Sequence, residues 1–297
     1  MIEQPTATET EKTTHTLQVP GAVLTYDVRR TDASAHPALM LIGSPMAAAG
    51  FETLARHFTD RTIVTYDPRG SERSEMADPA GQSTPDQHAD DLHRIIEAVG
   101  LRPVDLFASS GGAVNALALV ASYPAGVRML VAHEPPLGSL LPDRENALAT
   151  AQAIQQTYQR SGWGAGMAHF IAVVSHRGEF PDEYAQQPPP DPATFGMPTD
   201  DDGSRNDVML GQNIITCTHY EPDFPALGRA STRIIIAAGA ESEGEMANRG
   251  AYAVAERLGT EVTVFPSNHG GFLGGEYGQT GEPDAFAAKL RNVLGER

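Results

Sequence analysis

Cysteine is nearly absent from this chain of 297 residues, because Cys217 is the only one. No internal disulfide can form, which suits a reducing cytoplasm. No apolar run approaches the roughly 20 residues that a membrane-spanning helix needs. The first residues are polar and lack the basic and then apolar segments of a secretory signal. We therefore expect a cytoplasmic protein without a membrane span.

Lysine is also scarce, since Lys12 and Lys289 are the only two, and the formal net charge is −17. A surface this acidic repels phosphate backbones and anionic lipid headgroups. The composition therefore predicts no nucleic-acid partner and no membrane partner, and it leaves the oligomeric state unknown. The length suits one large α/β domain, or one domain with an insertion.

Short apolar runs alternate with segments of helical periodicity along most of the chain. Such alternation predicts a mainly parallel sheet with helices on both faces. The expected strands are 16–19, 23–28, 38–42, 62–66, 104–107, 127–132, 233–238 and 261–265. The expected helices are 51–58, 89–99, 113–122, 145–159, 206–216, 247–258 and 283–294.

The alternation breaks between residues 138 and 228, where helical stretches surround a segment rich in Pro, Asp and Gly at 181–203. Long loops inside compact domains are usually lids or disordered segments. We expect residues 138–228 to form a mostly helical cap with a mobile loop. Residues 15–137 and 229–297 would then form the core domain, and residues 1–14 a disordered tail.

The most informative segment is the turn Ala108-Ser109-Ser110-Gly111-Gly112, between an apolar run and an Ala-rich helical run. It follows the Gly-x-Ser-x-Gly pattern of a nucleophile elbow, with Ala at the first position. The central residue, Ser110, is the candidate nucleophile. A turn with no chemistry is the alternative, because short motifs give false positives.

An activated serine needs a base, and His269 in Asn268-His269-Gly270-Gly271 is the best candidate. It follows the last expected strand, and the chain order of serine first and histidine last suits this chemistry. The alternative is a loop histidine with no partner. The Gly111 N–H, directly after Ser110, is the first candidate oxyanion donor. The Ser44 N–H is the second, because Pro45 has none to donate.

Together these segments resemble the α/β-hydrolase fold superfamily over residues 15–296. The segments that carry the resemblance are Ile42-Gly43-Ser44-Pro45, Tyr66-Asp67-Pro68-Arg69-Gly70 with Arg73-Ser74, the elbow at Ser110, and Asn268-His269-Gly270-Gly271. The resemblance implies a mainly parallel eight-stranded sheet and a site of Ser, His and an acid, with no metal and no organic cofactor. The spacing of Cys and His is likewise not typical of a metal site.

The acid of this site departs from the usual family pattern. The position that commonly holds Asp is Ser242 here, in Gly239-Ala240-Glu241-Ser242. Glu134, in His133-Glu134-Pro135-Pro136, follows another strand, and some family members place their acid there. Either carboxylate need only reach the far nitrogen of His269 and hold its tautomer. We favour Glu134 and keep Glu241 as the alternative. A second departure is Ile42, where the family often has His.

The expected function is serine-dependent hydrolysis of a small, fairly apolar ester, lactone or related carbonyl compound. Ser110 at the nucleophile position excludes the family branches that use Asp there. Two other classes stay open. One is cofactor-free lyase, cyclase or perhydrolase chemistry on the same fold, and the other is a ligand-binding protein without turnover. The substrate itself is a small molecule that the sequence does not identify.

Overall fold

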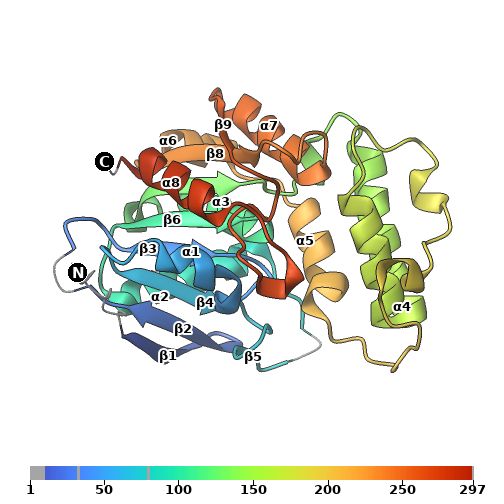
Figure 1. Cartoon of the computed structure of the whole chain (residues 1–297), viewed down its shortest axis with the longest axis horizontal. Helices are drawn as coiled ribbons and strands as arrows, with labels where there is room; N and C mark the ends of the chain where they lie inside the picture. Colours follow the sequence, from blue (N-terminus) through green and yellow to red (C-terminus); the bar gives the residue numbers. More distant parts are fainter. Residues whose placement is uncertain (1–10, 32–33, 79–80, 296–297) are drawn as a thin grey trace, which may run out of the picture.

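Strands from both halves of the chain form a single sheet in the computed structural model, which describes residues 11–31, 34–78 and 81–295 (Figure 1). The strand order is β1-β2-β4-β3-β6-β7-β8-β9, and β5 pairs with β2 beside this path. The strands are β1 (Lys12–Val19), β2 (Ala22–Arg29), β3 (Leu39–Ile42), β4 (Ile63–Asp67), β5 (Glu75–Met76), β6 (Val104–Ser109), β7 (Val127–His133), β8 (Arg233–Gly239) and β9 (Val262–Phe265).

The pairing of these strands agrees with their residue patterns. β3 is a continuous apolar run, β4 and β6 are mostly apolar, and all three are buried along their whole length. The sheet is parallel from β4 through β9, as expected for strands covered on both faces. β1 and β5 pair with β2 in the antiparallel sense, and β2 pairs with β4 in the same way.

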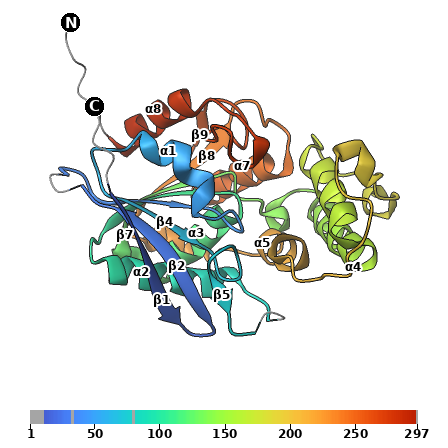
Figure 2. The ribbon, with the colours of Figure 1, turned by 60° about the horizontal axis from the view of Figure 1, so that its bottom comes forward.

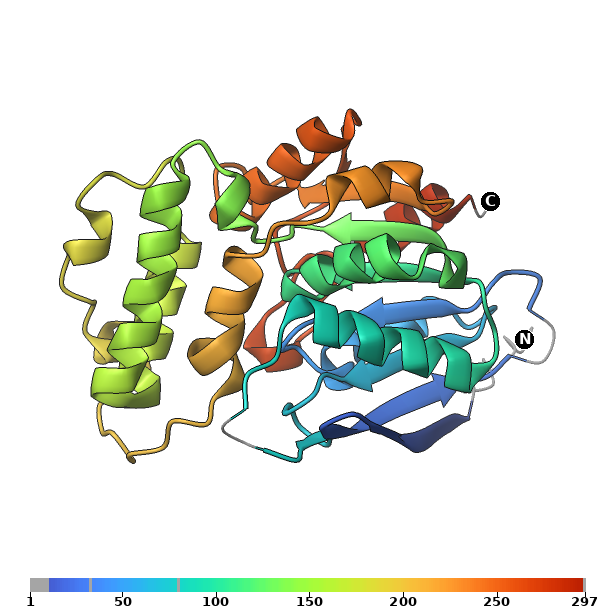
Figure 3. The same ribbon diagram turned by 180° about the vertical axis from the view of Figure 1, so that it is seen from behind.

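Helices cover both faces of the sheet, as Figures 2 and 3 show from two sides. One face carries α1 (Glu52–Arg56) and α8 (Pro283–Leu294), which pack around a cluster rich in phenylalanine. The other face carries α2 (Pro85–Val99), α3 (Gly111–Ser122), α6 (Phe224–Arg229) and α7 (Met246–Leu258), over a second, aliphatic cluster. The core therefore consists of two apolar layers separated by the sheet.

A separate helical region lies beyond the carboxyl ends of the parallel strands (Figure 1). Its long helix α4 (Arg144–Val174) turns at Gly162, whose φ of 82° ends one helical segment and begins the next. A π-helical turn (Met209–Asn213) leads into α5 (Ile214–Thr218). This helical region, called the cap below, packs around a third apolar cluster, which includes Ile154, Tyr158 and Leu210 together with Met246 of α7.

Short 3-10 turns complete the chain. They are η1 (Ala48–Phe51), η2 (Pro124–Gly126), η3 (Gly138–Leu140), η4 (Tyr184–Gln186), η5 (Pro192–Phe195) and η7 (Glu276–Gly278), and the π-helical turn is η6. Among the helices of the described ranges, none combines the length and the apolar character that crossing a bilayer requires.

Several expected boundaries differ from the structure. Most of the expected tail lies outside the described residues, but β1 begins at Lys12, so the end of that segment is a strand. The sheet has a ninth, two-residue strand, β5. All of α6 except Arg229 lies within the range expected for the cap, yet Leu227 packs into the core cluster with α3. The expected helix 145–159 continues to Val174, because its second segment is held by packing within the cap.

Candidate active site

Ser110 occupies a tight turn between β6 and α3. Its φ of 57° and ψ of −130° are unusual for a residue with a side chain. The Ser110 N–H donates to the His133 carbonyl oxygen at 3.0 Å, and helix α3 begins at the next residue. The neighbouring Ser109 is buried and contacts the His133 ring instead, with 3.1 Å between Oγ and Nδ1. Ser110 is therefore the hydroxyl of this pair that lines the cavity.

Two glycines let the start of α3 approach the loop after β3. A Cβ atom at Gly111 would collide with the Ser44 carbonyl oxygen, and one at Gly112 would collide with the Gly43 backbone. Any side chain at these positions would push the Ser44 turn away from the elbow. The structure thus brings Ser44 and Gly111, the two predicted oxyanion residues, into direct proximity beside Ser110.

His269 and Glu134 form a close pair, although 135 residues separate them in the chain. The distance from His269 Nδ1 to Glu134 Oε2 is 2.6 Å, and the Glu134 side chain is fully buried. The other carboxylate oxygen, Oε1, accepts from the Gly239 N–H at 2.9 Å, from Asn248 Nδ2 at 3.2 Å and from the Ser242 hydroxyl. Both oxygens of this buried carboxylate are therefore satisfied.

The surroundings shift the pKa values of this pair in opposite directions. Burial raises the pKa of Glu134. The hydrogen bonds from His269 and Ser242 and the charges of the neighbouring histidines outweigh this effect and hold the pKa of Glu134 well below its usual range. Burial lowers the pKa of His269, but the hydrogen bond and charge of Glu134, with Glu245 adding to them, leave it above its ordinary value. Glu134 is therefore ionised, and it stabilises the protonated imidazole.

Glu241, the alternative acid, is not in contact with His269. Its side chain is exposed, and the Ser267 hydroxyl is 3.5 Å from Glu241 Oε2. Ser242, at the position where the family commonly has Asp, donates to Glu134 instead of pairing with the histidine. The structure thus brings Glu134 and not Glu241 to the imidazole.

The strand order explains why these residues meet. Each of the four site residues follows a strand of the parallel part of the sheet: Ser44 follows β3, Ser110 follows β6, Glu134 follows β7 and His269 follows β9. These strands lie side by side in that order, with β8 between β7 and β9. Residues at the carboxyl ends of neighbouring parallel strands share one edge, where ligands bind in open α/β sheets.

A cavity of about 390 Å³ lies between this edge and the cap. Core residues that line it include Ser44, Ser110, Gly111, Glu245 and His269. The cap and the adjoining segments contribute a mostly apolar wall, with some amides and hydroxyls, that includes Pro136, Phe170, Val174, Ser175, Met209, Asn213, Ile214, Cys217, Thr218, Met246 and Gln279. A cavity of this size suits a small molecule.

The cap also contacts the Ser44 turn directly. Asn213, from the π-helical turn of the cap, donates through Nδ2 to the Ser44 hydroxyl at 3.0 Å. The sequence gives no signal for Asn213, because a lone Asn at the end of a helical stretch carries no distinguishing pattern. The sequence also gives no signal for Glu245 or Asn248, and it marks Ser242 only as the position that lacks the usual acid, because their roles depend on segments distant in the chain.

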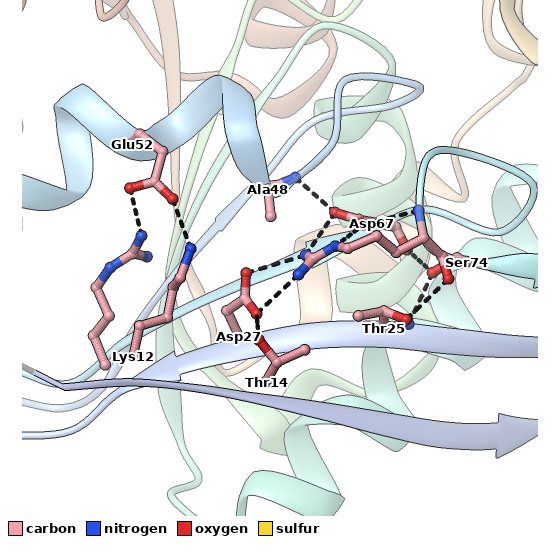
Figure 4. A network of polar contacts seen from close by, with 10 residues as sticks. Lys12, Thr14, Thr25, Asp27, Ala48, Glu52, Asp67 and Ser74 are labelled. Atoms are coloured by element: carbon pink, nitrogen blue, oxygen red, sulfur yellow. Dashed lines mark hydrogen bonds and ion pairs between the residues drawn. The ribbon is translucent and has the colours of Figure 1, made fainter.

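An ionic network of two buried carboxylates and the partly exposed Arg73 supports the segment that follows Ser44. Asp67, at the end of β4, accepts from the Ala48 N–H at 3.0 Å and from Arg73 Nε at 2.6 Å (Figure 4). Arg73 also pairs with Asp27 on β2 at 3.0 Å. Figure 4 shows Asp67 between Ala48 and Ser74, so its carboxylate joins the loop after β3 to the loop after β4. This is a turn-holding role, away from the cavity.

The site also brings possible metal-ligating atoms together, because His133, Glu134 and His269 offer three within 4.8 Å of one another. Most of their ligand atoms already form hydrogen bonds, although His133 Nε2 is buried without a partner among the described residues. His133 Nδ1 contacts Ser109, Glu134 is bonded on both oxygens, and His269 Nδ1 contacts Glu134. Burial lowers the pKa of His133 to about 4, against the effect of Glu134, so its ring is neutral. The set therefore fits a hydrogen-bonded dyad better than an open metal site.

Comparison with known proteins agrees with this architecture. A family model described as alpha/beta hydrolase fold matches residues 39–183. An uncharacterized hydrolase, YraK, from Bacillus subtilis (strain 168) is 31% identical over 263 residues, which cover 86% of this chain and 89% of that protein.

Solved structures of the same fold cover nearly the whole chain. A hydrolase from Pseudomonas aeruginosa PA01 has a TM-score of 0.66 and 19% identity over 95% of this chain and 98% of that one. The esterase EaEST from Exiguobacterium antarcticum has a TM-score of 0.64 and 19% identity over 94% and 97% of the two chains. At this level of identity these two structures match in fold alone. Taken with the relative from Bacillus subtilis, which is similar along most of its length, they show that the chain belongs to the α/β-hydrolase family.

Proposed function

We propose that this protein is a carboxylesterase-like serine hydrolase that cleaves a small, fairly apolar ester, lactone or related carbonyl compound. The observation that carries the proposal is the 2.6 Å contact between His269 Nδ1 and buried Glu134, at the wall of a cavity that Ser110 also lines. That contact fixes the tautomer of the imidazole and leaves Nε2 as the nitrogen that can take a proton.

The reaction would proceed through an acyl-enzyme. Ser110 Oγ attacks the carbonyl carbon while His269 Nε2 removes its proton, and Glu134 stabilises the imidazolium. The N–H groups of Gly111 and Ser44 hold the oxyanion of the tetrahedral intermediate. The protonated His269 then donates to the leaving alcohol, and a water molecule activated by the same imidazole releases the acyl group. Helix α3 begins at Gly111, so the positive end of its dipole also points toward the oxyanion.

A serine-directed aryl phosphonate tests the proposal. We expect it to abolish turnover of short-chain 4-nitrophenyl esters and to add one phosphonyl group to the peptide that contains Ser110, as read by mass spectrometry. The esterase EaEST, which shares the fold, gives independent reason to begin with esters. Stoichiometric labelling of another residue, or full ester turnover after Ser110 is labelled, would disprove the mechanism.

The pH dependence of kcat/KM should report the His269–Glu134 pair. The reaction needs neutral His269, and Glu134 raises the pKa of that imidazole above its ordinary value of about 6.5. Activity should therefore rise with pH through a midpoint above about 6.5. In Glu134→Gln the remaining activity should have this midpoint at lower pH, because the raising charge is gone. If the midpoint is the same in Glu134→Gln as in wild type, a group other than His269 controls the loss of activity at low pH.

A further inference from the structure

Glu245 contributes a carboxylate to the cavity that the proposed mechanism does not use. It precedes α7 with extended backbone (φ −66°, ψ 151°), and its side chain is 22% exposed. It lines the same cavity as Ser110 and His269, and its charge acts on the His269 imidazole. A molecule bound in the cavity could therefore contact the Glu245 carboxylate as well as the reacting serine.

The charges around the cavity are unbalanced. Among the described residues that line it, Glu245 is the only carboxylate, and neither Lys nor Arg is present. Glu245 forms an ion pair with Arg177 at 3.4 Å. The Arg177 side chain is 58% exposed and also donates to the Glu241 carbonyl oxygen at 2.7 Å. Arg177 is more than half exposed and does not line the cavity, so this ion pair is partly screened by solvent and offsets the charge of Glu245 only in part.

Burial, followed by the negative charge of Glu134, raises the pKa of Glu245. A raised carboxyl pKa means that the surroundings of Glu245 disfavour its ionised form. A cation bound beside Glu245 would relieve that cost, and an anion would increase it. The aromatic ring of Phe170 and the thioether of Met246 line the same cavity. An aromatic face with a carboxylate is a favourable environment for an ammonium group.

We propose that Glu245 selects substrates by charge, so that the cavity prefers esters carrying a quaternary or primary ammonium group and disfavours esters carrying a carboxylate. This proposal rests on the proposed function, because it names the substrate class of the same site. The ammonium group would lie against Glu245 and Phe170 while the ester carbonyl lies between Ser110, Gly111 and Ser44. The chemistry at the carbonyl is unchanged.

Matched esters that differ only in charge test the proposal. On the acyl side, three 4-nitrophenyl esters of equal chain length end in trimethylammonium, tert-butyl or carboxylate. On the alcohol side, acetylcholine is compared with its uncharged isostere, 3,3-dimethylbutyl acetate. In at least one arm we expect kcat/KM for the cation to exceed that of the isostere by about tenfold or more, at low salt. The carboxylate should be the poorest substrate, and high salt should reduce the preference.

Glu245→Gln should reduce the cation-to-isostere ratio to about twofold or less, because the amide keeps the shape and removes the charge. The matched control is Glu243→Gln, which removes an equal charge from an exposed position two residues away, outside the cavity lining. It should keep the wild-type ratio. Both substrates of a pair are measured on the same preparation, so a lower fraction of folded protein reduces both kcat/KM values equally and leaves their ratio unchanged. Equal ratios in Glu245→Gln and wild type would overturn the proposal.

Failure of the inference and failure of the proposed function give different results. If wild type hydrolyses the tert-butyl ester and is labelled at Ser110, yet shows no cation preference in either arm, only the role of Glu245 is wrong. If no ester is hydrolysed, calorimetry with choline ethyl ether and its uncharged isostere still tests the charge preference. Tighter binding of the ether in wild type but not in Glu245→Gln would support Glu245, and equal binding would reject it.

Discussion

Replacing Ser110 with alanine should lower kcat for short-chain 4-nitrophenyl esters by about 10⁴-fold or more, with little change in KM. The variant loses the nucleophile, and His269, Glu134 and the oxyanion donors can then act only on water. The turn itself should survive, since the Ser110 N–H bond to the His133 carbonyl uses the backbone. Stopped-time assays with enough enzyme to detect residual turnover, together with circular dichroism and thermal unfolding, measure both properties.

Ser109→Ala is the matched control for this prediction. Ser109 is adjacent in the chain, but its hydroxyl contacts buried His133 and lies outside the cavity lining. Its loss removes one buried hydrogen bond, so we expect a somewhat less stable protein whose kcat stays within about tenfold of wild type. If Ser109→Ala were inactive and Ser110→Ala active, the assignment of the nucleophile would be reversed.

Glu134→Gln should lower kcat by about 10³- to 10⁴-fold, because the amide would present N–H to His269 Nδ1 and favour the wrong tautomer. The substitution is nearly isosteric. An amide oxygen can still accept from the Gly239 N–H, Asn248 and Ser242, so the local structure should persist. Steady-state kinetics across pH, with thermal unfolding to confirm the fold, checks the result.

Glu241→Gln separates the two candidate acids. Glu241 is exposed and contacts Ser267, so we expect kcat to stay within about threefold of wild type, as for most surface substitutions. A strong loss in Glu241→Gln combined with a weak one in Glu134→Gln would show that the acid acts from the other loop in the working enzyme. Equal, small losses in both variants would remove the acid from the mechanism altogether.

The fold was largely predictable because its strongest signals are local. Strands such as β3 and β6 are short and mostly apolar, and the glycine-rich turn at Ser110 directly follows β6. The helices of the core carry apolar residues at helical spacing, and α2 even has a capping box at Thr84 and Gln87. These patterns depend on residues within about 15 positions of one another.

The cap was predicted less well for a physical reason. The second segment of α4, after Gly162, has no clear amphipathic pattern of its own, and its helix is stabilised by packing against the rest of the cap. The helix expected over 206–216 instead contains a π-helical turn, which places Asn213 against Ser44. Neither the packing of the cap nor the π-helical turn can be predicted from a short segment of sequence.

By itself, the sequence determined the order of most strands and helices along the chain, the serine at a strand-to-helix turn, and a histidine following the last strand. These depend on neighbouring residues, which act through backbone conformation and burial. Only the tertiary structure decided which carboxylate meets His269, because that depends on the alignment of β7, β8 and β9 at one edge. It also decided that Ser242 supports Glu134 and that Glu245 faces the cavity, since these contacts join segments that have no pattern in common.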